Sequence, residues 1–339
     1  MNPLLLRGIV LSFLFLIASV LHSTAAGAEA VTSRGQRAHR DRVTGLSFAR
    51  GGKSLATGSA DKTVKIWSVP EACLLHTLPA GPDPVNAVAF SPTGDLLAAA
   101  TGKVIQVWNA TNWTQVGRLA HHTRGVTALA FAPRGGSLVS GGQDGQVLFW
   151  NLTNRSVLDK GGDFGLLRPA LARPRRITVL AVSPDGTSVV SGDQRGWLKQ
   201  WSPKDYSMVR ELQPHLKSVS AVCFSADGEK FASTGLDNRI RLGHPKYLFV
   251  VRSWLTNTKE IRSLVFSSDG KFLAGGDGVG AISVWETATG TKARTLKAHA
   301  KGILAMARSP EGSILASASK DGTVKFWNLE EWTLVSEAR

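Results

Sequence analysis

The sequence predicts an all-β protein assembled from seven copies of one short antiparallel unit. The most complete copy, residues 299–328, contains three short runs of small, β-branched and aromatic residues. The turn at 309–312 reads Ser-Pro-Glu-Gly, where proline sets φ and glycine supplies a positive φ, and the turn at 320–322 contains Asp-Gly, which is typical of hairpins. Three short strands cannot enclose a core by themselves, so the copies must stack on one another.

The repeat itself is the strongest signal in the chain. An aromatic residue closes the third strand of six copies, and successive copies lie 41 or 42 residues apart except for one step of 51. The closing positions are Trp67, Trp108, Trp150, Trp201, Gly243, Trp285 and Trp327. A phenylalanine precedes the first turn in five copies, at Phe48, Phe90, Phe131, Phe224 and Phe266.

Four polar or aromatic positions recur within the better-preserved copies: a His at the start, a Ser or Thr in the second strand, an Asp in the next turn and the closing Trp. They are His39, Thr57, Asp61 and Trp67; His122, Ser140, Asp144 and Trp150; His215, Ser233 and Asp237, with Gly243 in the Trp position; and His299, Ser317, Asp321 and Trp327. This pattern resembles the WD-repeat β-propellers over about residues 36–339.

The resemblance implies a seven-bladed propeller of four-stranded antiparallel blades across residues 39–339, in which the four side chains form a hydrogen-bonded chain that fixes each blade. Copies two, four and six lack the His, and their Asp positions hold Gly102, Arg195 and Val279. We expect those blades to be locally less stable. The outer strand of the last blade could come from residues 333–337 or from residues 31–38, so residues 29–38 are either a linker or a closing strand.

The first 28 residues have the features of a secretory signal peptide. They contain one charge, Arg7, then an apolar run over residues 9–21 and the small-residue site Ala-Gly-Ala at 26–28. Thirteen residues span roughly 20 Å as a helix, less than the ~30 Å of a bilayer core. An uncleaved anchor is the alternative. We therefore expect a secreted or periplasmic protein, and two cysteines too far apart in the repeat to pair, Cys73 and Cys223, favour a bacterial envelope.

The formal charge of +15 predicts attraction to acidic or anionic partners. Two residues after the His position, five consecutive copies carry a cation: Arg124, Arg175, Lys217, Lys259 and Lys301. The first two copies carry Asp41 and Asp83 there. In a propeller this position lies in the loop that enters each blade, so the five would form a cationic arc around the channel. The alternative is a solvated loop that simply tolerates Lys and Arg.

The step of 51 residues marks an insertion at residues 161–176, which joins a Phe-Leu-Leu segment to four arginines: Arg168, Arg173, Arg175 and Arg176. Arginine suits carboxylate or phosphate recognition because its guanidinium donates two parallel hydrogen bonds. We expect a partner-binding loop beside the arc; neutral variation in length is the alternative.

Catalytic and metal-binding motifs are lacking in the sequence. His121 adjoins His122, which already belongs to a repeat position, and the glycine-rich run at 275–280 falls between two predicted strands and opens no helix, as a phosphate loop would. We predict no cofactor and a non-catalytic scaffold, monomeric or within a hetero-complex, that binds an acidic protein. The alternatives are binding of an anionic polymer or membrane surface and, less favoured, an enzyme with a catalytic propeller face; nucleic acid is disfavoured.

Overall fold

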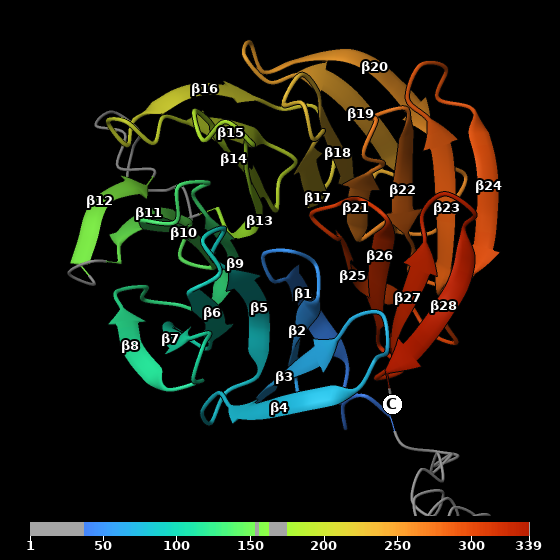
Figure 1. The fold of residues 1–339 in the computed structure, drawn as a ribbon. Coiled ribbons are helices and arrows are strands. Elements are labelled where there is room, and N and C mark those ends of the chain that lie inside the picture. The colour runs from blue at the N-terminus through green and yellow to red at the C-terminus, as the bar shows by residue number, and fades with distance from the viewer. Residues whose placement is uncertain (1–36, 153–155, 163–174, 339) are drawn as a thin grey trace, which may run out of the picture. The chain divides into compact units, whose positions relative to one another are not determined.

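A computed structural model describes residues 37–152 and 175–338, together with the backbone of residues 156–162. These residues form seven four-stranded antiparallel sheets, the blades, arranged around one central axis (Figure 1). This confirms the predicted fold class. No helix occurs in these ranges, so none of the described segments is a helix that could cross a membrane.

Each blade contains four consecutive strands. Blade 1 contains β1 (Val43–Phe48), β2 (Ser54–Ser59), β3 (Thr63–Ser68) and β4 (Leu74–Pro79). Blade 2 contains β5 (Val85–Phe90), β6 (Leu96–Thr101), β7 (Val104–Asn109) and β8 (Gln115–Ala120). Blade 3 contains β9 (Val126–Phe131), β10 (Ser137–Gly142), β11 (Gln146–Asn151) and β12 (Ser156–Gly162). Blade 4 contains β13 (Ile177–Val182), β14 (Val189–Asp193), β15 (Leu198–Trp201) and β16 (Met208–Leu212).

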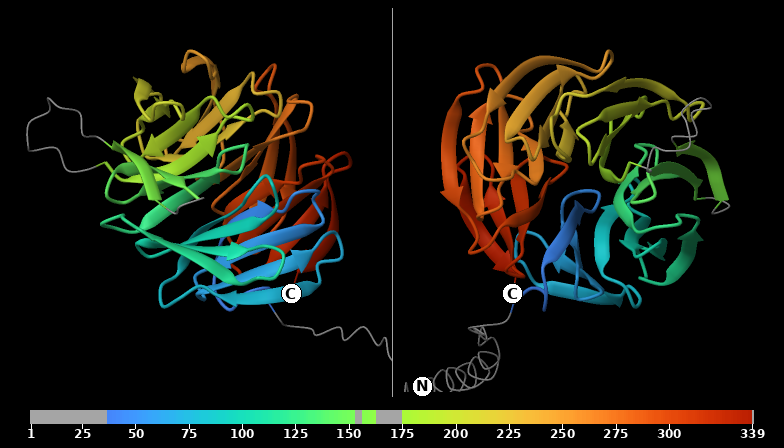
Figure 2. Two further views of the ribbon diagram at one scale, coloured as in Figure 1. Left: turned by 60° about the vertical axis from the view of Figure 1, so that its left-hand side comes forward. Right: turned by 180° about the vertical axis from the view of Figure 1, so that it is seen from behind.

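Blade 5 contains β17 (Val219–Phe224), β18 (Phe231–Gly235), β19 (Arg239–His244) and β20 (Phe249–Leu255). Blade 6 contains β21 (Ser263–Phe266), β22 (Phe272–Gly276), β23 (Ala281–Glu286) and β24 (Lys292–Lys297). Blade 7 contains β25 (Ile303–Arg308), β26 (Ile314–Ser319), β27 (Val324–Asn328) and β28 (Thr333–Ala338). The first strand of each blade is innermost, and the ring is open at its centre when seen from behind (Figure 2).

The turn between the first two strands explains the recurrent serine of the repeat. In blade 7 the amide of Gly312 donates to the carbonyl of Ser309 at 2.9 Å, and Gly312 has a φ of 88°. The Ser309 hydroxyl is fully buried and accepts from the amide of Ile314 at 3.0 Å. The serine therefore closes the turn while glycine provides the left-handed conformation that other residues avoid.

The hydrophobic core lies between blades. One cluster joins Ile66 of blade 1 to Val85 and Leu97 of blade 2, and each of these residues is fully buried. Since each blade completes its core with its neighbour, the stacking expected from the sequence is what stabilises the fold.

The ring closes between blades 7 and 1. The outermost strand of blade 7 is β28, so the C-terminal segment supplies that position. Phe326 and Val324 pack in one cluster with Leu55 and Trp67 of blade 1, and the amide of His39 donates to the carbonyl of Gly322 at 3.1 Å.

A belt of side-chain hydrogen bonds links neighbouring blades around the channel. The second residue of the innermost strand donates to a backbone carbonyl of the next blade in five consecutive blades. The donors are Thr44, Asn86, Thr127, Thr178 and Ser220, and the acceptors are Val85, Val126, Ile177, Val219 and Ile261, at 2.6 to 2.9 Å. By the spacing of the repeat, the same position falls on Arg262, directly before β21, in blade 6 and on Leu304 in blade 7. We call this position the clip position.

Candidate functional site

The four recurrent side chains of blade 1 form one buried hydrogen-bonded chain. The indole of Trp67 donates to the Thr57 hydroxyl at 2.9 Å, Thr57 lies 2.6 Å from Nε2 of His39, and Nδ1 of His39 lies 2.8 Å from Asp61. This order places the histidine proton on Nδ1, facing the carboxylate. Burial lowers the pKa of His39, and burial acts to raise the pKa of Asp61 but is outweighed by hydrogen bonds from His39 and Thr63. The pair is a neutral imidazole beside an ionised carboxylate.

Blade 3 repeats this chain, and blade 7 repeats it with Thr323 between His299 and Asp321. His122 lies 2.8 Å from Ser140 and 2.9 Å from Asp144, whose pKa falls to about 2 because hydrogen bonds, chiefly from His122, outweigh the effect of burial. In blade 7, His299 lies 2.7 Å from Ser317 but 3.7 Å from Asp321. These histidines and acids are engaged inside the blades, which leaves them unsuited to substrate chemistry.

Blade 5 replaces the indole with other contacts. His215 lies 2.9 Å from Ser233 and 3.0 Å from Asp237, and Arg241 donates to Asp237 at 3.0 Å. Gly243 leaves no side chain at the Trp position, and the ring of Phe231 occupies that space. Burial, only partly offset by Asp237, lowers the pKa of His215 to about 4.

Blades 4 and 6 have an aspartate that the repeat pattern did not reveal. Asp193 and Asp277 lie two residues before the usual Asp position. Asp277 accepts from the amides of Val279, Gly280 and Ala281, and Asp193 accepts from those of Arg195 and Trp197. The glycine-rich run at 275–280 is therefore the end of β22 and a turn capped by its own aspartate.

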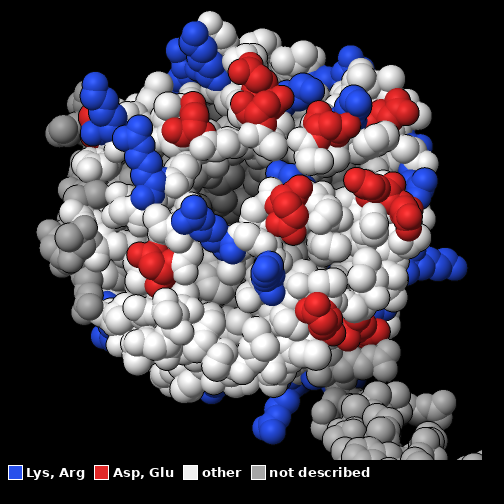
Figure 3. Space-filling view, in the orientation of Figure 1, with Lys and Arg blue, Asp and Glu red and all other residues white. Residues whose placement is uncertain are grey.

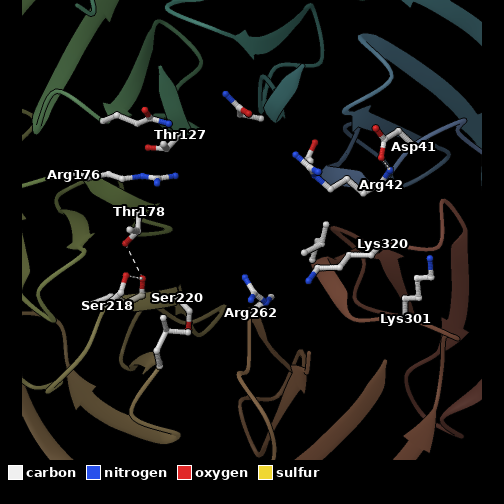
Figure 4. A pocket seen from close by; sticks show the side chains of 16 residues that line it. Asp41, Arg42, Thr127, Arg176, Thr178, Ser218, Ser220, Arg262, Lys301 and Lys320 are labelled. Carbon is white, nitrogen blue, oxygen red and sulfur yellow. Dashed lines mark hydrogen bonds between the residues drawn. The ribbon is translucent and has the colours of Figure 1, made fainter. Parts of the chain in front are cut away.

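A cavity of about 840 Å³ that could receive a ligand lies at the end of the channel where each blade is entered. Its charged lining residues are Arg42, Arg176, Arg262, Lys301, Lys320 and a single acid, Asp41. Thr44, Asn86, Thr127, Thr178, Ser220 and Leu304 form a ring behind them. Figure 4 shows Arg42, Arg176, Arg262 and Lys320 extending into the cavity from several sides.

The two ends of the channel differ in charge. The blades follow one another clockwise in Figure 1 and anticlockwise in Figure 4, so the two figures look along the channel from opposite ends. Figure 3 has the orientation of Figure 1 and shows Asp and Glu as well as Lys and Arg around the central hollow. The cavity with its five cations and one acid lies at the end that Figure 4 shows.

The cations singled out from the sequence lie in different environments. Arg124, Lys217, Lys259 and Lys301 are exposed in the loops that enter their blades, but only Lys301 of the five arc residues lines the cavity. Arg175 is half-buried, with its guanidinium 5.0 Å from the Trp197 ring and 4.0 Å from Asp193. Arg176 lines the cavity, whereas Arg168 and Arg173 lie outside the described residues.

Sequence reasoning missed Arg42, Arg262 and Lys320. Arg42 stands one residue after the repeat position that Asp41 occupies in its copy, and Lys320 belongs to a predicted hairpin turn, so neither falls on the position shared by the five predicted cations. An alignment of the seven copies would have revealed Arg262, because the other six carry Thr, Ser, Asn or Leu at the same repeat position.

The described residues contain no group of three or more His, Cys, Asp or Glu side chains placed to hold a metal ion. The two cysteines are unpaired, and burial raises the pKa of Cys223 to about 12, which keeps its thiol protonated.

Comparison with known proteins places these features in a family. The family model described as "WD domain, G-beta repeat" matches residues 31–68, 72–109, 113–151, 206–242, 249–279 and 290–328, well over half of the chain. Residues 152–205, which include the insertion and most of blade 4, are matched by none of the six segments.

Three relatives show similarity over part of their length. "Transducin beta-like protein 3" of Mus musculus is 27% identical over 179 residues, which cover 50% of this chain and 22% of the relative. "WD repeat-containing protein WDS homolog" of Arabidopsis thaliana is 27% identical over 187 residues, 52% of this chain and 34% of the relative. "WD repeat-containing protein srw1" of Schizosaccharomyces pombe is 29% identical over 112 residues, 32% of this chain and 20% of the relative.

The chain therefore spans between a fifth and about a third of the length of these relatives. From the second on, each matched segment covers the outermost strand of one blade and inner strands of the next, so the segments repeat with the period of the blades. Together with the closed seven-bladed ring, they establish that the chain belongs to the WD40 family of WD-repeat propellers.

Proposed function

We propose that this chain is a non-catalytic interaction scaffold of an extracytoplasmic compartment, and that the cationic end of its channel binds an acidic partner protein. WD-repeat propellers act in general as protein-interaction scaffolds. The observation that carries the proposal is the lining of the cavity, where five Lys and Arg side chains face one Asp.

The lining favours binding over catalysis. The hydroxyls of Thr44, Thr127, Thr178 and Ser220 donate to backbone carbonyls of the next blade. Their protons are therefore committed to the fold. Asp41 accepts from the amide of Arg42 at 2.6 Å, so one of its oxygens caps the backbone. The cations therefore carry most of the charge that could meet a ligand.

The electrostatics favour an acidic partner. Charges of one sign that line a concave surface focus the field and accelerate the approach of an oppositely charged molecule. Arginine can hold a carboxylate through two parallel hydrogen bonds, which adds specificity to charge. Arg124, Lys217 and Lys259 would extend the attractive surface outward from the cavity.

The test is a charge reversal at the channel. We expect the triple variant Arg42→Glu, Arg176→Glu and Lys320→Glu to weaken binding of a fluorescent 20-residue poly-glutamate peptide at least tenfold at about 0.1 M salt, because like charges then meet. The matched control reverses Lys53, Arg134 and Lys271, three exposed cations in the turns after the first strands, and should retain binding. Equal loss in both variants would mean that net charge alone, and not the channel, attracts the peptide.

A second experiment separates the acidic protein from an anionic surface. The protein is mixed with phosphatidylglycerol vesicles and, separately, used in an affinity pull-down from envelope extract at low and at ~0.5 M salt. Discrete proteins that remain bound in high salt and depend on the channel cations support the scaffold. Vesicle binding that is lost in salt, with no protein retained, would favour the anionic polymer or membrane alternative.

The proposed compartment has its own test. Residues 1–30 fused to a reporter that is active only after export should yield activity, and replacing the apolar residues 13–16 by Lys should abolish it. An inactive wild-type fusion would contradict the extracytoplasmic setting without affecting the channel.

A further inference from the structure

Arg262 is the residue at which the ring departs most from its own repeat. It occupies the clip position of blade 6, where five other blades place a hydroxyl or amide that donates to the next blade. No such bond from Arg262 to blade 7 is present among the described residues. A guanidinium has replaced a structural link.

The contacts of the Arg262 guanidinium do not compensate for the missing hydrogen bond to blade 7. Nη2 of Arg262 donates to Glu260 at 2.5 Å, but Glu260 is itself exposed. Nε of Arg262 is buried and has no hydrogen-bond partner within the described residues. Arg42, Arg176, Lys301 and Lys320 line the same cavity, so the nearby charges are mostly of the same sign. A buried donor without an acceptor and converging like charges both destabilise a fold unless a ligand satisfies them.

We propose that the channel contains a site for a small multivalent oxyanion, a polycarboxylate or phosphate compound, with Arg262 as its central ligand. The anion would accept from the guanidinium of Arg262, once that side chain turns its unpartnered Nε toward the cavity, and would neutralise the cations that point inward from blades 1, 4 and 7 (Figure 4). The cavity of about 840 Å³ is large enough for a ligand of this size.

The clip position of blade 7, where Leu304 stands, differs from that of blade 6 in a way that supports a ligand at Arg262. Blade 7 also lacks the clip, but its residue is apolar and adds no charge. In blade 6 the departure instead brings the longest cationic side chain to a position that faces the channel. A position at which a repeat protein departs from its repeat and gains a charged side chain is expected to be functional.

This site is separate from the docking of an acidic protein proposed above. A small anion would lie at the level of the clip ring, whereas a protein would contact the loops that enter the blades. A carboxylate side chain of that partner could also reach the site, so the experiment tests the free anion and the partner separately.

The key variant is Arg262→Thr, which removes the guanidinium and restores the clip chemistry of blades 1, 3 and 4. Inorganic pyrophosphate and citrate are titrated calorimetrically into the whole protein at about 50 mM salt. We expect dissociation constants below about 1 mM for the wild type and at least a tenfold weakening in Arg262→Thr. The variant should fold and should melt at an equal or higher temperature, because it gains a link to blade 7.

Leu304→Thr is the matched control, since it restores the other missing clip and leaves the charges unchanged. It should bind both anions as the wild type does. The proposal is overturned if the wild type binds pyrophosphate and citrate no better than sulfate or chloride, which would mean an adventitious ion only. It is also overturned if Arg262→Thr binds as tightly as the wild type, or if Leu304→Thr loses binding equally.

The second arm uses the poly-glutamate peptide and distinguishes the two proposals. Failure of the small anions with intact peptide binding to Arg262→Thr would reject the channel site and leave the scaffold standing. Loss of peptide binding in Arg262→Thr, with no small-anion binding by the wild type, would reject the free anion and assign Arg262 to the partner. Small-anion binding without peptide binding would retain the channel site and reject the scaffold.

Discussion

At position 243 blade 5 carries glycine where the six other blades carry tryptophan, and a neighbouring residue has changed with it. The strand partner of that tryptophan is leucine or valine in the other blades, for example Leu55 beside Trp67, but it is Phe231 beside Gly243. A Cβ added at Gly243 would meet the carbonyl oxygen of Phe249 at 2.2 Å and ring atoms of Phe231 at 2.4 Å. The larger ring thus fills space that the indole occupies elsewhere.

Restoring the tryptophan alone is therefore expected to harm the fold. Gly243→Trp should lower the free energy of unfolding by about 1–3 kcal/mol, because it overpacks a site that Phe231 already fills. The double variant Gly243→Trp with Phe231→Leu recreates the pair of the other blades and should recover the part of the loss that the Phe231 ring causes, while the close contact with the Phe249 carbonyl remains. Urea denaturation measures both; a double variant no more stable than Gly243→Trp would show that the two residues do not compensate each other.

His215 makes stability depend on pH in a defined window. Burial lowers its pKa from 6.5 to about 4 in the folded state, so between these values the unfolded chain binds more protons than the folded protein. Stability from this residue is fully present above pH 6.5 and is lost as pH falls toward 4. From pH 7 to pH 5 we expect a loss of about 2 kcal/mol, measured by urea denaturation.

The control for this effect is His215→Asn, which cannot titrate. Its free energy of unfolding should be lower at pH 7, and its decrease between pH 7 and pH 5 should be smaller by a similar amount. An identical pH dependence in the wild type and the variant would assign the effect to other groups.

At the scale of the element, the clip belt joins blades that the chain otherwise connects only through loops. Thr178 is a good probe because its hydroxyl bonds within blade 4, to Gly192 at 3.0 Å, and across to blade 5, to Val219 at 2.7 Å. Valine has nearly the same shape but cannot donate.

We expect Thr178→Val to lower the free energy of unfolding by about 1–3 kcal/mol, because it leaves carbonyl groups without their donor. Thr187→Val in the same blade is the comparison: Thr187 is exposed and bonds only within its turn, so the change should lie within about 0.5 kcal/mol. Thermal and urea unfolding report both variants. Equally small losses of stability in Thr178→Val and Thr187→Val would mean that the clip hydrogen bonds do not stabilise the packing of the blades.

The strands themselves could be predicted closely from the sequence. In blade 7 the predicted second strand, residues 313–319, contains β26, and the predicted third strand, residues 323–327, overlaps β27, because alternating apolar residues and Ser-Pro-Glu-Gly or Asp-Gly turns are local signals. The fourth strands were harder to predict. β16 and β24 are largely exposed and carry little apolar periodicity, so only their pairing with β15 and β23 defines them.

At the scale of the whole molecule, charge is distributed by the geometry of the ring. The sequence has a formal charge of +15, but that number does not say which end of the channel carries the excess. The turns after the first strands bring acids such as Asp227 and Asp269 to one end, while the loops that enter the blades bring Arg42, Arg176 and Lys301 to the other. Under the function proposed above, the cations that line the cavity would orient an acidic partner toward this end of the channel.

By itself, the sequence determined the number of blades, their three inner strands, their turns and the buried His–Ser/Thr–Asp–Trp positions, because each of these depends on spacing along the chain. Only the tertiary structure decided which cations face the channel. Lys301 lines the cavity, but the other four arc residues do not, while Arg42, Arg262 and Lys320 do. A shift of one residue in a loop or strand turns a side chain toward the axis or away from it, and that direction is defined only once the blades close around a common centre.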